Sequence, residues 1–194
     1  MATIDISGAI GLIAMMLLTL NFLMGMMLSA AYKKSVYWIK LPEQVKKLNI
    51  NNLHNYTAYI ALGLVLVHAL LIPLDPSSKF SFTDLLLPLN APHQPKIVLL
   101  GLISFIAFLL VIISTQKKIK KSLGFRAWKN IHLISYCTAI LFVVHGILMD
   151  PLLKDRPTDW IDAEKLLAEG CAALILIATI IRYRYHIASK KNLN

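Results

Sequence analysis

The sequence that decides the fold is RAWKNIHLISYCTAILFVVHG, at residues 126–146. It begins with a short basic segment, in which Arg126 and Lys129 flank a tryptophan, and continues as a run of apolar residues. His132 lies near the start of this run and His145 near its end. An ionisable side chain inside a bilayer is costly, so histidines within an apolar run indicate a functional site.

A second apolar run, at residues 53–74, contains His54 and His68 at matching depths. Five apolar runs in all are long enough to cross about 30 Å of hydrocarbon as helices. They lie near residues 7–30, 53–74, 96–115, 130–149 and 163–183. We therefore predict an all-α integral membrane protein, a bundle of five transmembrane helices that forms a single domain over residues 1–194.

The composition and the distribution of charge support this prediction. Of the 194 residues, 57% are hydrophobic and 15% are charged, whereas a soluble domain carries about 25% charged residues. Most of the 20 basic residues follow the first, third and fifth runs, and the acidic residues lie mainly in the other connections. The positive-inside rule then predicts an N-terminus outside and a C-terminus in the cytoplasm. The net charge of +10 thus indicates a lipid bilayer as the partner and not nucleic acid.

The four histidines form two pairs, and the two members of each pair lie at the same depth, or level, in the membrane. The second and fourth helices run parallel, because one spanning helix separates them. His54 and His132 each lie about one turn inside the cytoplasmic ends, while His68 and His145 lie near the outer ends. Each level offers one imidazole from each helix, and a pair of neutral imidazoles is a standard way to hold haem iron. With 13 or 14 residues between them, the levels are about 20 Å apart, which predicts one haem near each membrane surface.

The spacing in the fourth helix departs from this plan. Thirteen residues place His132 and His145 about 140° apart around an ideal helix, so we expect that helix to tighten, tilt or bind its haems on different sides. Arg126 and Lys129 lie within two turns before His132. We predict that they offset the propionate charge of the inner haem, with simple anchoring at the inner membrane surface as the alternative.

The same residues resemble a known family. The spacing H-x13-H in the second run and H-x12-H in the fourth, with RAWKNIHLISY at residues 126–136, is similar to the ferric reductase-like transmembrane domain superfamily. This superfamily includes NADPH oxidases, ferric reductases and the haem-binding membrane subunit of the periplasmic methionine sulfoxide reductase system. The resemblance covers roughly residues 50–150. It implies two b-type haems that pass electrons across a membrane and, through the bacterial relatives, a bacterial inner membrane.

The chain also differs from some members of this superfamily. NADPH oxidases and eukaryotic ferric reductases continue into a cytoplasmic domain that binds FAD and NAD(P)H, and we find no glycine-rich phosphate loop here. We therefore expect an oxidoreductase component whose donor is a cytoplasmic flavin reductase, a flavin supplied by a partner, or membrane quinol. The expected outer acceptor is ferric iron, dioxygen or a partner protein. The methionine sulfoxide reductase relatives need no histidine at the place of His54, so its presence favours the two-haem arrangement of ferric reductases.

Two other functions are compatible with the histidines. A transporter could use them as a metal or proton path, although transporters usually show internal repeats and helices broken at the midplane, which these histidines avoid. A structural or assembly subunit could use them as hydrogen bonds between helices. A visible absorption spectrum of the purified protein separates both functions from that of a haem protein.

Overall fold

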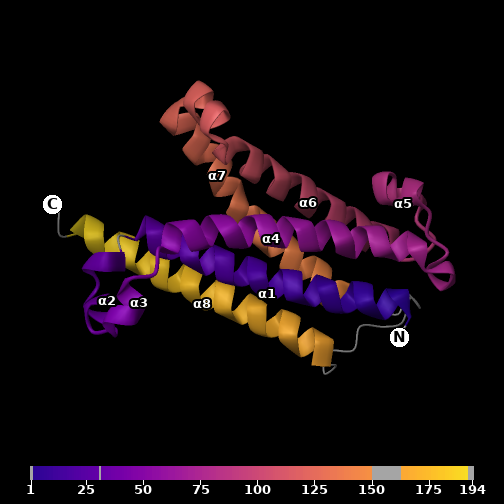
Figure 1. The fold of residues 1–194 in the computed structure, drawn as a ribbon, viewed down its shortest axis with the longest axis horizontal. Helices are drawn as coiled ribbons and strands as arrows, with labels where there is room; N and C mark the ends of the chain where they lie inside the picture. The colour runs from indigo at the N-terminus through magenta and orange to yellow at the C-terminus, as the bar shows by residue number, and fades with distance from the viewer. Residues whose placement is uncertain (1, 31, 150–162, 192–194) are drawn as a thin grey trace.

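The computed structural model describes residues 2–30, 32–149 and 163–191 (Figure 1). Its five long helices are α1 (Thr3–Ser29), α4 (Ile50–Leu71), α6 (Pro95–Thr115), α7 (Lys117–Leu148) and α8 (Ala163–Lys191). Each of them includes a stretch that is long and apolar enough to cross a membrane. The predicted all-α architecture is therefore confirmed, with five helices that are candidate membrane spans. The orientation of the chain and its assignment to one domain stay predictions.

The long helices form two antiparallel pairs joined by the last helix. α1 packs along α4, α6 packs along α7, and α8 lies against both α1 and α7. The backbones of α4 and α7, which contain the four histidines of interest, hardly approach each other. In Figure 1, α7 crosses behind α4 at an angle. The bundle thus leaves space between the two histidine-bearing helices.

Short helices connect the long ones at the two ends of the bundle. Between α1 and α4 lie η1 (Tyr32–Lys34), α2 (Val36–Ile39) and α3 (Glu43–Lys46). Between α4 and α6 lie η2 (Ile72–Leu74), η3 (Pro76–Ser78), α5 (Phe82–Leu86) and η4 (Pro88–Asn90). In this second connection Phe80 and Ala91 are buried against Ile4, Val98 and Met149. It therefore covers the end of the bundle at which α4 and α7 finish.

α7 is longer than the predicted run, which began near residue 130. Residues 117–123, in the basic connection between the third and fourth runs, are helical, as their lysine and leucine content favours. Gly124 interrupts the helix with a φ of 73° and a ψ of 165°, a conformation that glycine adopts without steric cost. The break in this connection is thus a single residue between two helical segments, and the second segment enters the bundle.

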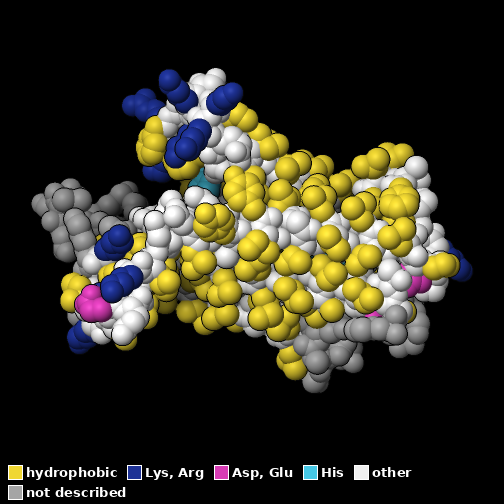
Figure 2. Space-filling view, viewed as in Figure 1, with side chains coloured by type: hydrophobic (Ala, Val, Ile, Leu, Met, Phe, Trp, Pro, Cys, Tyr) yellow, Lys and Arg dark blue, Asp and Glu magenta, His cyan; other side chains and the backbone are white. Residues whose placement is uncertain are grey.

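Side chains on the surface divide by type. Figure 2 shows hydrophobic side chains over the middle of the molecule and most of the visible Lys and Arg side chains toward one end. We call this the basic end; there α1 finishes, and α7 begins with Lys117, Lys118, Lys120 and Lys121. Large apolar side chains are exposed on every long helix, including Leu20, Leu66, Ile106, Ile140 and Ile177. Such continuous apolar surface fits lipid contact better than contact with water.

Candidate functional site

Two cavities lie between α4 and α7, one toward each end of the bundle. His68 and His145 line a cavity of about 320 Å³. His54 and His132 line a second cavity, of about 710 Å³, toward the basic end. Both volumes fall within the range of about 300–1,000 Å³ that is usual for cofactor sites. The structure thus brings together the two histidine pairs that the sequence predicted, and we name each cavity by its pair.

In the His54–His132 cavity the two imidazole rings face each other at close range. Their centroids are 6.3 Å apart and their planes differ by 72°. A metal–imidazole bond is about 2 Å long and the ring centroid lies about 1 Å beyond the nitrogen, so two axial imidazoles would have centroids about 6 Å apart. The observed separation therefore fits one metal centre between the two rings.

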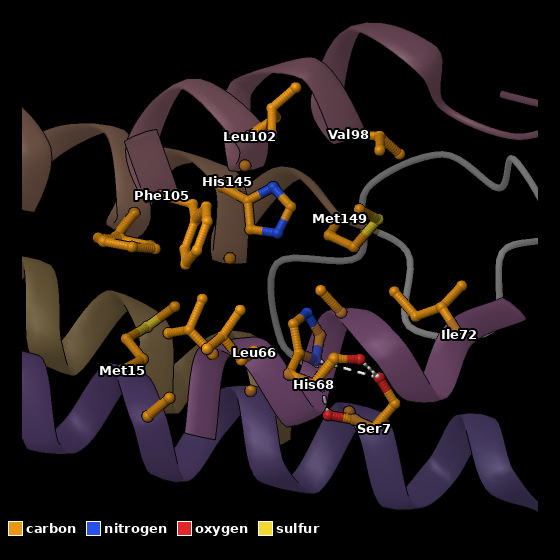
Figure 3. Close-up of a pocket in the computed structure, with 18 of the residues that line it drawn as sticks. Ser7, Met15, Leu66, His68, Ile72, Val98, Leu102, Phe105, His145 and Met149 are labelled. Atoms are coloured by element: carbon orange, nitrogen blue, oxygen red, sulfur yellow. Dashed lines mark hydrogen bonds between the residues drawn. The ribbon is translucent and has the colours of Figure 1, made fainter. Parts of the chain in front are cut away.

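The His68–His145 cavity is walled by apolar side chains. Figure 3 shows His68 and His145 on opposite sides of it, with Leu66, Phe105 and Met15 among the surrounding groups. The described residues contain no group of three or more His, Cys, Asp or Glu side chains that could hold a bare metal ion. Paired imidazoles in an apolar cavity suit a flat cofactor that brings most of its own metal ligands.

α1 positions both histidines of α4 through the same kind of hydrogen bond. The backbone carbonyl of Ser7 lies 2.8 Å from Nδ1 of His68, and the hydroxyl of Ser7 donates to the carbonyl of His68 at 2.8 Å (Figure 3). The backbone carbonyl of Asn21 lies 3.0 Å from Nδ1 of His54, and the Asn21 amide donates to the carbonyl of His54 at 2.5 Å. The Asn21 amide also donates to Thr57, at 2.8 Å. Each imidazole therefore has an acceptor for a proton on Nδ1.

Glycines bring the helix backbones close to three of the four rings. A Cβ atom on Gly11 would lie 2.9 Å from Nδ1 of His68, and one on Gly25 would lie 3.3 Å from Cε1 of His54. Each glycine comes four residues, about one helical turn, after the residue whose carbonyl faces that Nδ1. Only glycine lets these rings reach the backbone carbonyl without displacement, since a Cβ makes ordinary contact at about 3.5–4.0 Å.

α6 repeats the arrangement for His145. The carbonyl of Ile97 lies 2.9 Å from Nδ1 of His145. Four residues further along α6, a Cβ on Gly101 would lie 2.8 Å from Cε1 of the same ring. His54, His68 and His145 thus all have Nδ1 against a carbonyl of a neighbouring helix, while none of the described residues forms a hydrogen bond with their Nε2 atoms. Nε2 is the atom left to bind a ligand.

His132 is held differently. Its Nδ1 is buried and has no hydrogen-bond partner among the described residues, and the same is true of Nε1 of Trp128. The two rings stack, with centroids 5.3 Å apart and planes 25° apart. Nζ of Lys120 lies 3.7 Å from the centroid of the Trp128 ring, because the turn at Gly124 folds the preceding helical segment back beside the indole.

The cations near the cavities are partly those predicted. Lys129 lines the His54–His132 cavity, whereas Arg126 is exposed and is not among its lining residues. Lys120, which the sequence did not single out, also lines this cavity. At the other cavity Lys165 is buried, and its Nζ donates to the carbonyls of Ile147 and Met149 at the end of α7. Each cavity thus has at least one cation in its wall.

α7 accommodates its thirteen-residue spacing without a break. Gly124 is the only residue with non-helical backbone angles in this helix, so the segment from residue 125 to 148 is continuous. The helix crosses α4 at an angle (Figure 1). Of the three predicted solutions, the tilted helix agrees with the structure, and the binding of haems on different sides stays a prediction.

Comparison with known proteins identifies the family. The family model described as ferric reductase like transmembrane component matches residues 7–144, which is well over half of the chain. A search of the curated proteins finds no match. The chain therefore belongs to the ferric reductase-like transmembrane component family. Membership implies electron transfer in a membrane, and members typically bind haem b.

Proposed function

From this family membership and the two histidine pairs, we propose that the protein transfers electrons across a membrane through two haem b groups. His54 and His132 would hold one haem at the basic end, and His68 and His145 would hold the other at the opposite end. Bound haem b supplies one-electron exchange at its iron. The chain itself supplies ligation, spacing and the polarity of the two cavities.

One observation carries the proposal: each cavity presents one imidazole from α4 and one from α7. For three of the four rings, Nδ1 lies against a backbone carbonyl, which leaves the lone pair of Nε2 available. This is the usual second-shell arrangement of metal-binding histidines, in which the carbonyl fixes the tautomer and the ring orientation. The fourteen-residue interval from His54 to His68 sets the two levels about 20 Å apart along α4.

The cations in the cavity walls have a role in the same proposal. Haem propionates are anionic, and nearby cations stabilise such a charge. Lys129 and Lys120 at one cavity and Lys165 at the other would offset this charge. Arg126, exposed and outside the cavity wall, suits the anchoring alternative better, although it too lies within two turns before His132.

The direction of transfer follows from the predicted orientation. With the basic end in the cytoplasm, electrons enter at His54 and His132 from a flavin reductase, a partner's flavin or quinol. They leave at His68 and His145 for ferric iron, dioxygen or a partner protein.

The first experiment is a visible absorption spectrum of the purified protein with a haem-to-protein ratio. We expect about two haems per chain and the bands of six-coordinate haem b, sharpening on reduction. A folded protein without these bands would refute the proposal and favour a histidine-based transporter or an assembly subunit.

A second experiment tests the pairing. The double variant His68→Ala/His145→Ala should keep one low-spin haem, as should the double variant His54→Ala/His132→Ala. Removing one member of each pair, as in His54→Ala/His145→Ala, should instead disturb both haems. If His54 and His68 behaved as the two ligands of one site, the assignment of one pair to each cavity would be wrong.

A further inference from the structure

The four histidines differ in how the ring nitrogen that faces away from the cavity is held. Nδ1 of His54, His68 and His145 lies 3.0, 2.8 and 2.9 Å, respectively, from a backbone carbonyl oxygen of a neighbouring helix. Each of these rings also lies against a glycine, so no side chain separates it from that helix. Such a ring has a fixed orientation and one favoured tautomer before any cofactor binds.

His132 lacks both features. Its Nδ1 is buried without a hydrogen-bond partner in the described part of the chain, and no described glycine has this ring among its nearest neighbours. Thirteen residues after Gly101, the same interval that separates His132 from His145, α6 has Ser114 in place of a glycine. The hydroxyl of Ser114 donates to the carbonyl of Val111 in its own helix.

The contact that positions His132 is a stack on Trp128, one turn earlier on α7. Stacking limits how far the ring can tilt, but it selects neither tautomer and adds no acceptor for Nδ1. The cavity in front of this ring is also the larger of the two, at about 710 Å³ against about 320 Å³. The ring therefore has both a weaker hold and room to move.

Resting on the proposed function, we infer that His132 is a displaceable ligand. If haem is bound as proposed, small neutral molecules such as carbon monoxide or imidazole would take the place of His132 at the site that His54 and His132 hold, and would not bind at the site that His68 and His145 hold. Loss of a second-shell hydrogen bond typically weakens metal binding about 10–100-fold. His132 should leave its iron more readily than the other three histidines by a factor of that order.

Carbon monoxide added to the reduced protein tests this inference. The wild type should bind about one carbon monoxide per two haems, seen as a shifted Soret band. The variant His68→Ala/His145→Ala, which retains only the His54–His132 pair, should bind it fully, and the variant His54→Ala/His132→Ala should not bind it. Binding to the second variant, or to neither haem of the wild type, would overturn the inference.

Substitutions at Trp128 give a test that leaves all four ligands in place. Trp128→Ala removes the stack and should raise the rate of carbon monoxide binding severalfold. Trp128→Phe keeps an aromatic ring there and should remain close to the wild type. Equal rates in the two variants would contradict a role of the stack in holding His132.

A measurement without haem separates this inference from the proposed function. In protein labelled with ¹⁵N at histidine, His54, His68 and His145 should show the tautomer protonated on Nδ1, and His132 should show a mixture with faster proton exchange. If the protein takes up no haem, the proposed function fails, while these spectra still decide whether His132 differs from the others. Four histidines with the same tautomer and exchange rate would overturn the inference.

Discussion

Replacing Gly101 by alanine should selectively weaken the haem site at His68 and His145. The added Cβ would lie 2.8 Å from Cε1, 3.0 Å from Nδ1 and 3.2 Å from Nε2 of His145. Ordinary contact requires about 3.5–4.0 Å, so the ring must retreat from α6 by about 0.7 Å or more. The carbonyl of Ile97 projects from the same side of α6, and its 2.9 Å distance to Nδ1 would grow to about 3.6 Å, beyond hydrogen-bonding range.

The size of the effect follows from this lost contact. A buried donor left without a partner costs about 1–3 kcal/mol, and a factor of ten in affinity corresponds to about 1.4 kcal/mol. We therefore expect haem affinity at this site to fall roughly 5- to 150-fold, which overlaps the 10–100-fold range for second-shell changes. The His54–His132 site should keep its haem, because Gly101 does not line that cavity.

The assay is the haem-to-protein ratio after incubation with a haem-scavenging protein, together with the low-spin electron paramagnetic resonance signals. Gly63→Ala is the matched control, since a Cβ there meets nothing within 4 Å. It should leave both haems in place and stabilise α4 by about 0.5–1 kcal/mol. Gly11→Ala should affect the same haem as Gly101→Ala, from the other wall. Unchanged haem retention and signals in Gly101→Ala, or equal loss of both haems, would refute the reasoning.

Three further predictions follow from the charges and the ends of the bundle. Cysteines introduced singly at Ser81 and Ser122, both exposed, should be labelled from opposite sides of the membrane, and labelling from one side would contradict the predicted orientation. Lys129→Gln should lower the reduction potential of the His54–His132 haem by tens of millivolts, as expected for a charge removed near the iron, whereas equal shifts of both haems in a redox titration would count against it. Hydrogen bonds from Ser77 and from the N–H of Ile4 hold the pKa of Asp75 below its usual range. This stabilisation is present above the unfolded-state pKa, near 4, and is lost as the pH falls through the lower folded-state pKa. Thermal unfolding from pH 6 to pH 3 should therefore show a smaller acid-induced loss in Asp75→Asn than in the wild type.

The sequence predicted the spans and the histidine pairs because both depend on one-dimensional patterns. Hydropathy marks a helix that must satisfy its own backbone in lipid, and helices separated by one span run parallel. His54 and His132 could therefore be assigned to the same level before any contact was known. The extent of α7 was harder to predict, because residues 117–123 are strongly basic and helical at once, and the break at Gly124 is a single residue.

The residues that hold the histidines were missed, although the sequence contains a signal for two of them. Gly11 and Gly25 are fourteen residues apart, as are His54 and His68. In two antiparallel helices, equal spacings place each glycine opposite one histidine, and the structure shows these contacts. Gly101 could not be found in this way, since α6 has no second glycine to form an interval with. Lys120 reaches Trp128 only because of the turn at Gly124. A hydropathy pattern does not reveal such a turn.

The alternative in which the histidines form hydrogen bonds between helices is partly correct. The same hydrogen bonds leave the other ring nitrogen available to bind a ligand. Nδ1 of His54, His68 and His145 does join neighbouring helices through backbone carbonyls. A histidine that served only as a bridge would still leave its Nε2 without a partner among the described residues. α4 and α7 would also gain by closing the space between them, because helices in lipid associate through close van der Waals packing. Instead the two backbones stay apart, and a cavity lined by one imidazole from each helix lies at each level. Two haems would fill this space and would bond to the nitrogens that the bridges leave unpaired.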